Sequence, residues 1–204
     1  MSDDGGFFAV ARSQRAHRSF TTDPVPDDDL VRMLEAATWA PSAENSQPWL
    51  FVVVRDAGRR AALDDLARRL WAGGAKHATA HRSPAHVLAE VDRATEAGFG
   101  GAPVVVVVAG DTTACHRVSL ASSVFPAVQN LLLAAASLGY GTALTTLATY
   151  ATDEVRSVLD LPDHVDPLAI IPVGRPARPL GPSRREPVAT RSHLDGYGRP
   201  FPAG

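Results

Sequence analysis

The chain of 204 residues contains one cysteine and one lysine, and each shortage excludes a class of protein. The lone thiol, Cys115, cannot form an internal disulfide, which fits a reducing compartment. Lys76 is the only lysine and the formal net charge is −2, so no general basic field attracts nucleic acid or an anionic membrane. The acidic start MSDDGG is not a secretory signal, and no stretch approaches the roughly 20 apolar residues of a membrane span. We therefore expect a soluble cytoplasmic protein that binds neither nucleic acid nor membrane.

Several motifs that carry chemistry are also missing. The sequence has no GxGxxG after a strand, no GxxxxGK[ST] and no GxSxG. Cys115 and His116 are adjacent, so in regular structure their side chains diverge. His77, His81 and His86 lack the cysteine or acidic company of a metal site, so we expect solvated histidines and no metal. An enzyme of this composition needs an organic cofactor to carry the reaction.

The hydrophobic pattern predicts strands that alternate with helices in a single domain over residues 1–204, with three layers and an α/β or α+β class. The expected strands are 49–54, 103–109, 142–146 and 168–173. The first expected helix ends at about residue 40, and the others span 58–71, 84–98, 123–138 and 152–159. Pro126 falls in the first turn of the fourth helix, where its missing N–H matters little. Residues 72–83 have no apolar period, which predicts a mobile loop.

The segment APSAENSQPW, residues 40–49, suits neither a helix nor a strand. Its two prolines restrict the loop, and Asn45 and Gln47 each present a donor and an acceptor. Such side chains suit the edge of a flat heterocycle, for example a flavin or a base. The alternative is structural: the two amides cap a helix end and tie down a turn.

Two groups of arginines are candidates for binding a phosphate. Arg12, Arg15 and Arg18 are spaced by three, so in a helical turn they would share one side. Arg184 and Arg185 lie in a tail rich in proline, arginine and glycine, residues 175–204, which should not fold alone. Guanidinium groups bind phosphate bidentately, so both groups could meet around one phosphate. The alternative is a solvated basic face.

Taken together, the motifs resemble those of the nitroreductase family of FMN-dependent oxidoreductases. The resemblance covers roughly residues 12–188, and the motifs occur in the family's order. They are RSQRAHRSF through the PVP turn to PSAENSQPW, then GAPVVVVVAGD, QNLLLAAASLGYGTALTT and LAIIPVGRPA. The resemblance implies an α+β, three-layer α/β/α fold with a mixed central sheet. It also implies an intertwined homodimer with two FMN at its interface. The helix containing QNLLLAAA would lie at the dimer centre, and the tail would wrap the partner subunit.

The resemblance also implies the flavin-binding residues. The matching positions are Arg15, Ala16, Arg18, Pro41, Ser42, Ala43, Asn45, Thr145, Thr146, Arg184 and Arg185. The first two arginines would contact the phosphate, the ribityl chain or the pyrimidine edge, and Arg185, or else Arg184, would reach the phosphate. Residues 41–45 would line the flavin, with the amide of residue 45 bonded to its ring or ribityl chain. Thr145 and Thr146 would place backbone N–H groups against flavin N5.

One departure weakens the phosphate site. Where many family members have Arg-Arg-Ser, this chain has Gln14-Arg15-Ala16. The missing guanidinium and hydroxyl could weaken FMN binding by about 1–3 kcal/mol, unless another arginine serves.

The implied activity is a ping-pong transfer from NAD(P)H through the flavin to an electron-poor acceptor, such as a nitro compound or a quinone. No side chain acts as the catalyst, although the Thr146 hydroxyl could tune the flavin between one- and two-electron steps. Residues 72–83, with Trp71 and His86 beside them, would cover the substrate face. Two alternatives stay open: a flavin-dependent dehydrogenase or oxidase of another small molecule or peptide, and a non-catalytic FMN-binding protein.

Overall fold

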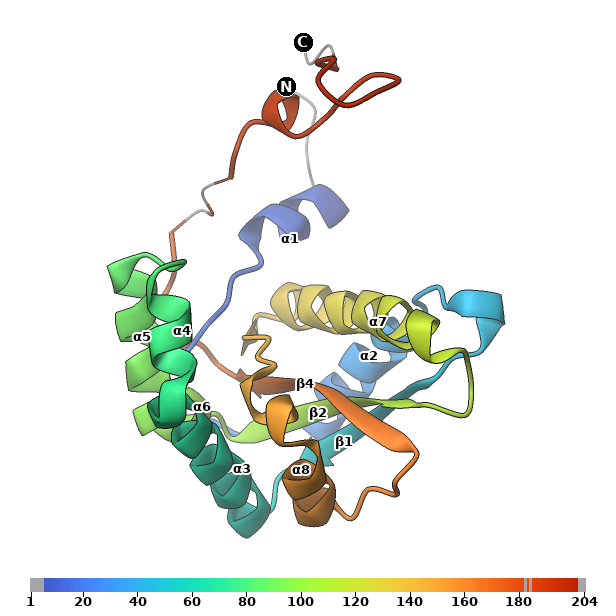
Figure 1. The fold of residues 1–204 in the computed structure, drawn as a ribbon. Helices are drawn as coiled ribbons and strands as arrows, with labels where there is room; N and C mark the ends of the chain where they lie inside the picture. Colours follow the sequence, from blue (N-terminus) through green and yellow to red (C-terminus); the bar gives the residue numbers. More distant parts are fainter. Residues whose placement is uncertain (1–5, 182, 184, 202–204) are drawn as a thin grey trace.

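The computed structural model describes residues 6–181, 183 and 185–201. Its centre is a four-stranded sheet in the order β1-β2-β4-β3 (Figure 1). The strands in that order are Trp49–Val54, Val104–Asp111, Val165–Gly174 and Gly141–Thr142. All three strand pairs are antiparallel, and the parallel element of the expected mixed sheet is an isolated bridge between Ala16 and Thr142. Strand direction depends on the connections between strands, which the residues of a single strand do not reveal.

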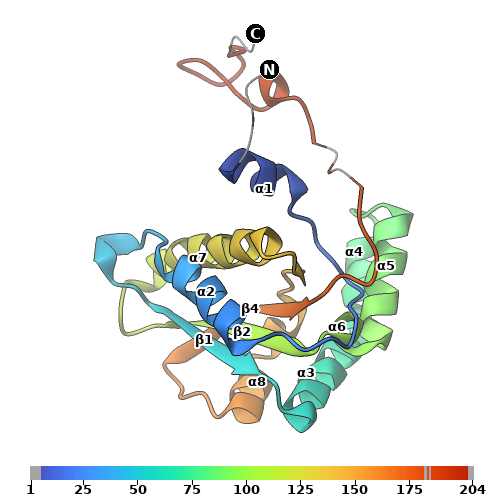
Figure 2. The ribbon, with the colours of Figure 1, turned by 180° about the vertical axis from the view of Figure 1, so that it is seen from behind.

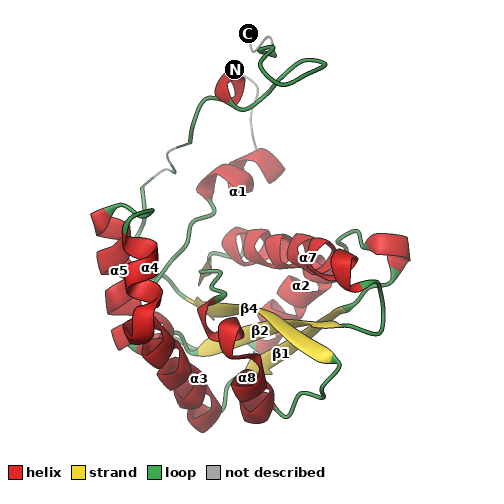
Figure 3. Cartoon of the chain, in the orientation of Figure 1, coloured by secondary structure: helices red, strands yellow, loops and turns green. Residues whose placement is uncertain are grey.

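Helices cover both faces of the sheet, as expected for an α+β fold of three layers (Figure 3). One face packs on α2, Asp27–Thr38, and α7, Arg117–Ser137. The other packs on α3, Ala57–Leu70, and α8, Thr152–Leu159. The remaining elements are α1 (Phe7–Ser13), η1 (Ala43–Asn45), the π-helical η2 (Trp71–Ala75), α4 (Lys76–Ala80), α5 (Ala85–Glu96), α6 (Gly98–Gly101), η3 (Leu147–Ala151) and η4 (Val188–Thr190).

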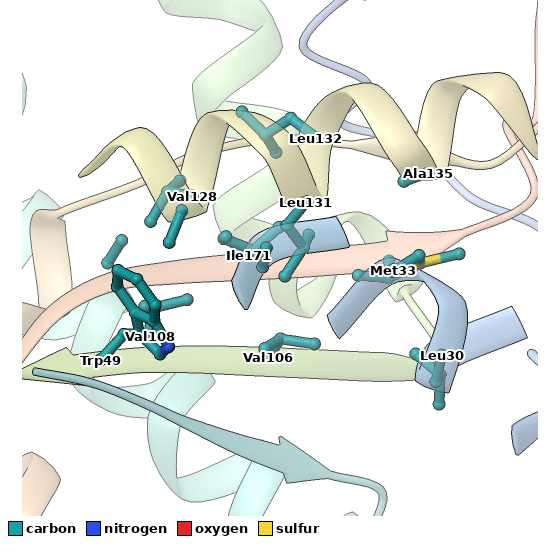
Figure 4. Packing of buried hydrophobic residues seen from close by; sticks show 14 of the residues in the cluster. Leu30, Met33, Trp49, Val106, Val108, Val128, Leu131, Leu132, Ala135 and Ile171 are labelled. Carbon is teal, nitrogen blue, oxygen red and sulfur yellow. The ribbon is translucent and has the colours of Figure 1, made fainter. Parts of the chain in front are cut away.

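The central strand β2 shows why the fold needs two helical layers. Its valines alternate between the faces and are buried on both, so each face requires an apolar cover. On the α2 and α7 side, Leu30, Met33 and Leu131 gather over Val106 (Figure 4). Side chains of this size contribute about 1.5–3 kcal/mol each when they are fully buried.

Element boundaries were predicted best where the residues form a continuous apolar run. β1 spans Trp49–Val54 as expected. Helix α7 begins at Arg117, not at 123, so the expectation that Pro126 lies in the first turn is wrong and this proline is in the helix interior. The first turns of α7 contain exposed residues of mixed character, such as Val118, Ala121 and Ser122, and therefore show no apolar period.

The expected loop at 72–83 is helical over most of its length. The π-helical η2 and the short α4 cover residues 71–80, so the prediction of a loop is wrong. Helix α4 has no buried residue, and Gly74 interrupts the helix with φ 141°, so no apolar period could reveal it. The mobility of this segment stays a prediction.

The tail leaves the sheet after β4 and runs past α1, away from the layered body (Figures 1 and 2). None of its described residues from Arg175 onward is buried. Backbone bonds connect its start to the N-terminal segment, from the Thr21 N–H to the carbonyl of Arg175 at 2.9 Å and from the Ala177 N–H to the carbonyl of Ser19 at 3.0 Å. Further along the tail, the Arg15 guanidinium donates to the carbonyl of Gly181, and the Ser183 hydroxyl donates to the carbonyl of Arg12 at 3.5 Å. Arg184 lies outside the described residues.

One helix of the described part of the chain, α7, meets the length and composition criteria for crossing a membrane. The expectation that no segment approaches such a length is therefore wrong. Inside this fold 44% of the apolar window is buried, and core helices of soluble proteins meet the same criteria. More than half of the window is left uncovered by the single chain.

Candidate functional site

The segment of residues 15–20 lies extended along the β3 edge of the sheet. The His17 N–H donates to the carbonyl of Thr142 at 2.8 Å. Two glycines allow this close approach: a Cβ on Gly141 would lie 2.8 Å from the Cβ of His17, and a Cβ on Gly100 would meet the segment's backbone at 2.3 Å. The segment is therefore held by the sheet itself, which fixes where its side chains begin.

The expectation that Arg12, Arg15 and Arg18 share one side of a helical turn is wrong. Helix α1 ends at Ser13, and the chain continues extended, so the three side chains leave the backbone in different directions. Arg15 reaches the tail, whereas Arg18 pairs with Glu90 of α5 at 3.5 Å.

A first cavity of about 350 Å³ lies beside this segment and is lined by Ala16, Arg18, Arg93, Arg178 and Glu90, among others. Glu90 binds two of the arginines, with Oε2 at 3.5 Å from Arg18 and Oε1 at 3.0 Å from Arg178. Three guanidinium groups against one carboxylate leave the cavity with an excess of positive charge. This donor set suits a phosphate, which guanidinium groups bind bidentately.

The electrostatics around His17 agree with a basic cavity. Burial lowers the pKa of His17, and the positive charges of Arg15 and Arg178 lower it further. The imidazole is therefore neutral near pH 7 and adds no charge to the site.

Two further cavities continue from the first. The second, of about 140 Å³, shares Arg18 with the first and is lined also by Thr145. The third, of about 660 Å³, shares Thr145 with the second and adds Thr146 with Trp71. Shared lining residues thus connect the arginines to the two threonines.

The backbones of the two threonines differ in what they can offer a ligand. Thr145 exchanges both backbone bonds with Ile170 of β4, donating at 3.0 Å and accepting at 2.8 Å. Its N–H is therefore occupied within the sheet. The carbonyl of Thr146 accepts from Thr149, both from its N–H at 3.1 Å and from its hydroxyl at 2.6 Å. No hydrogen bond from the Thr146 N–H is found within the described residues, whereas the Thr145 N–H is already bonded. Thr146 is therefore the better backbone donor for a bound ligand.

The loop of residues 41–47 is tied down by its own side chains. Ser42 Oγ accepts from the N–H of Gln47 at 3.0 Å, and Gln47 Nε2 donates to Asn45 Oδ1 at 3.3 Å. The N–H of Ala43 donates to Ser123 Oγ of α7 at 3.1 Å. In the single chain the two amides therefore tie down the turn, as the structural alternative expected, but neither of them caps a helix end, and Asn45 and Gln47 are both exposed.

The backbone of this loop is strained. Glu44, Asn45 and Gln47 have φ values of 53°, 55° and 48°, in the left-handed region that non-glycine residues seldom adopt. Three such residues within four positions point to a functional loop, because strain of this kind is concentrated at binding sites.

The single chain does not bring the loop and the arginines together. Ala43 is bonded to Ser123 near the start of α7, whereas the segment around Thr142 follows the helix end at Ser137. The 14 steps from residue 123 to residue 137 span about 21 Å of helix at about 1.5 Å per residue. Figures 1 and 2 agree that η1 and β3 lie toward opposite ends of α7.

The predicted site residues therefore divide into two groups. Ala16, Arg18, Thr145 and Thr146 line the connected cavities, with Arg15 directly before them. Pro41, Ser42, Ala43 and Asn45 lie at the other end of α7. Arg185 lies in the exposed tail.

Sequence reasoning missed two residues that line the cavities, Arg178 and Asp64. Arg178 stands in the proline-rich tail, where no period marks it. Asp64 had a usable signal, because it falls on the apolar stripe of α3 between Leu63 and Ala67. An acid on a buried helix face is uncommon and often functional.

An arginine-lined cavity at the edge of the sheet, with two mostly apolar cavities that share lining residues with it, suits a phosphorylated organic cofactor. The family comparison identifies the class further: the Nitroreductase family model matches residues 11–175. The chain belongs to the nitroreductase family.

Relatives of known sequence and structure agree. An NADH dehydrogenase of Thermus thermophilus is 29% identical over 197 residues, covering 88% of this chain and 91% of the relative. A 5,6-dimethylbenzimidazole synthase of Rhodospirillum rubrum is 30% identical over 180 residues, covering 84% and 82%. A solved structure from Desulfovibrio desulfuricans, described as a nitroreductase in complex with FMN, is 28% identical with a TM-score of 0.74 and covers 95% of this chain and 96% of that chain.

Proposed function

We propose that this chain is an FMN-dependent oxidoreductase that takes electrons from NAD(P)H and passes them to an electron-poor acceptor, in a ping-pong sequence. The observation that carries the proposal is the arginine-lined cavity whose lining connects it to Thr145 and Thr146. Membership of the nitroreductase family and the FMN complex of a 28% identical structure support the choice of cofactor.

The arginines hold the phosphate in this proposal. Arg18 and Arg178 already face each other across Glu90, so their guanidinium groups are positioned before a ligand arrives. Arg178 replaces the guanidinium that is missing at Gln14, and Ala16 leaves room beside it. The weaker phosphate wall expected from the sequence is thereby compensated.

The other residues bind and shield the ring. Bound FMN supplies hydride acceptance and donation at flavin N5, so no side-chain nucleophile is required. The N–H of Thr146 would donate a hydrogen bond to the bound flavin, and its hydroxyl would tune one- against two-electron steps. Trp71 and Tyr150 line the largest of the three cavities, and the buried Trp71 would shield one side of the ring from water.

A second copy of the chain completes the site. The loop of residues 41–47 is bonded to Ser123, about 21 Å along α7 from the helix end that leads to Thr142, so in this proposal it reaches the flavin of another subunit. The apolar outer face of α7 and the exposed tail provide the surface for an intertwined homodimer with the tail on the partner. The lone Cys115 and a reducing cofactor agree with a cytoplasmic location.

The test is an absorbance spectrum of the purified protein, followed by anaerobic addition of NADH or NADPH. We expect a flavin spectrum that either reductant bleaches and that a nitro compound or quinone restores. A yellow protein that neither nucleotide bleaches would favour the non-catalytic alternative. Oxygen and small dehydrogenation substrates belong in the same screen, because the 30% identical relative carries the name of a different activity, 5,6-dimethylbenzimidazole synthase.

A further inference from the structure

The second cavity has one carboxyl group on a wall that is otherwise mostly apolar. Asp64 projects from α3, and its Oδ1 is shut off from solvent without a hydrogen-bond partner. Its Oδ2 lies over Gly98, where a Cβ would come within 2.5 Å of that oxygen, so the glycine at φ +66° leaves room for the carboxyl. A buried acceptor without a partner is costly in a folded protein, and each such group requires an explanation.

The rest of the cavity has the size and character of a site for one small ring. Its volume is about 140 Å³, and apolar side chains from α5, α6 and β4 line it: Val91, Ala94, Phe99 and Pro172. An apolar cavity of about 150 Å³ in another protein holds one benzene molecule. The cavity therefore fits a benzene-sized group, and Asp64 is the polar group that would orient it.

We propose that Asp64 binds the hydrogen-bond donor, an amino or hydroxyl group, of a small cyclic ligand whose ring fills this cavity. Thr145 lines the same cavity and the adjoining one that contains Thr146, so the bound ring lies beside the expected flavin. Its role as a substrate subsite rests on the proposed function, whereas the binding itself does not.

The charges around Asp64 favour a neutral donor over a cation. Burial raises the pKa of Asp64 to about 6, and the positive charges of Arg68 and Arg60 on the same helix lower it in part. Arg18 faces the cavity from the N-terminal segment, and the lining residues from α5, α6 and β4 are uncharged. The three arginines offset the attraction of the carboxylate for a further cation, but the carboxylate remains a strong acceptor above pH 6.

A bridging water is the competing explanation. Arg60 Nε, one helical turn before Asp64, is also buried without a hydrogen-bond partner. A water between Arg60 Nε and Asp64 Oδ1 would satisfy both groups without any ligand. The cavity would then prefer the more apolar of two rings of equal shape.

The experiment compares para-fluoroaniline with para-fluorotoluene, which differ in one donor group. Both are titrated onto the purified full-length protein with its flavin by fluorine NMR. We expect the aniline to bind about tenfold more tightly than the toluene at a pH about two units above the Asp64 pKa. The preference should fall as the pH drops below about 6, because protonation removes the charged acceptor.

Two variants assign the preference to the carboxyl. Asp64→Asn should bring the affinity ratio close to one, whereas Asp65→Asn, an exposed position on the same helix, should keep it. Equal binding of both probes by the unaltered protein, or a ratio that Asp64→Asn leaves unchanged, would overturn the proposal. A colourless protein that still prefers the aniline would overturn the flavin assignment alone, and a yellow protein without the preference would overturn the role of Asp64 alone.

Discussion

Replacing Asp64 by asparagine should stabilise the protein at neutral and alkaline pH. Burial raises the pKa of this carboxyl from 3.8 to about 6, so the folded state binds its proton more tightly than the unfolded chain does. The stability that protonated Asp64 contributes is fully present at low pH and is lost as the pH rises from 3.8 through about 6. Asparagine has the same shape and carries no charge at any pH.

The structure sets the size of the effect. A pKa raised from 3.8 to about 6 corresponds to an upper limit of about 3 kcal/mol, at about 1.4 kcal/mol per pH unit. Because Asp64 is only half-buried, solvent screening reduces this figure, and we expect a gain of about 1 kcal/mol.

Urea unfolding measures this gain at fixed protein and FMN concentrations, since both affect the apparent stability. The difference between Asp64→Asn and the unaltered protein should be largest well above pH 6 and should shrink toward pH 4. Asp65→Asn is the control: its pairs with Arg68 and Arg69 are exposed, so its effect should stay within about 0.5 kcal/mol and be destabilising. A loss of stability for Asp64→Asn at alkaline pH, or a gain that does not change with pH, would refute the reasoning.

Three further predictions concern the proposed flavin site. Arg178→Ala should raise the FMN dissociation constant at least about tenfold, because it removes charge-assisted bonds to the phosphate. The control Arg32→Ala, at an exposed position, should leave the constant unchanged, and fluorescence titration with FMN measures both. Ala16→Ser should tighten FMN binding in the same titration, and weaker binding would contradict the hydroxyl's expected role. Gly141→Ala should lower the unfolding free energy by about 1–3 kcal/mol, because its Cβ would overlap His17; an unchanged urea midpoint would contradict that packing.

The sequence predicted the elements that have a strong apolar pattern. β1 and β2 are continuous apolar runs, and the stripe of α2 contains Leu30, Met33 and Ala37, so their positions follow from periodicity. Helix α4 has no buried residue, so it has no stripe to read. The direction of the strands and the start of α7 depend on connections and on exposed small residues, which periodicity does not report.

The sequence names candidate site residues one by one but not their arrangement in space. The motifs around Arg18 and Thr145 follow from the family resemblance, and the structure places both on one cavity. The loop at Asn45 matches the family motif equally well, yet in the single chain the length of α7 separates it from Arg18 and Thr145. The order of motifs along a sequence does not report the distance between them in space. Arg178 has no local signal, since its role depends on Glu90, 88 residues earlier.

The most direct test of the two-chain flavin site is one FMN titration on a mixture of two variants that are unfolded and refolded together. Arg178→Glu damages the arginine half, and Asn45→Ala damages the loop half, so each variant alone should bind FMN weakly at both sites. If each site joins two chains, a mixed dimer contains one intact site, and about one quarter of all sites should regain tight binding. A mixture that binds FMN no better than the two separate variants would contradict the account.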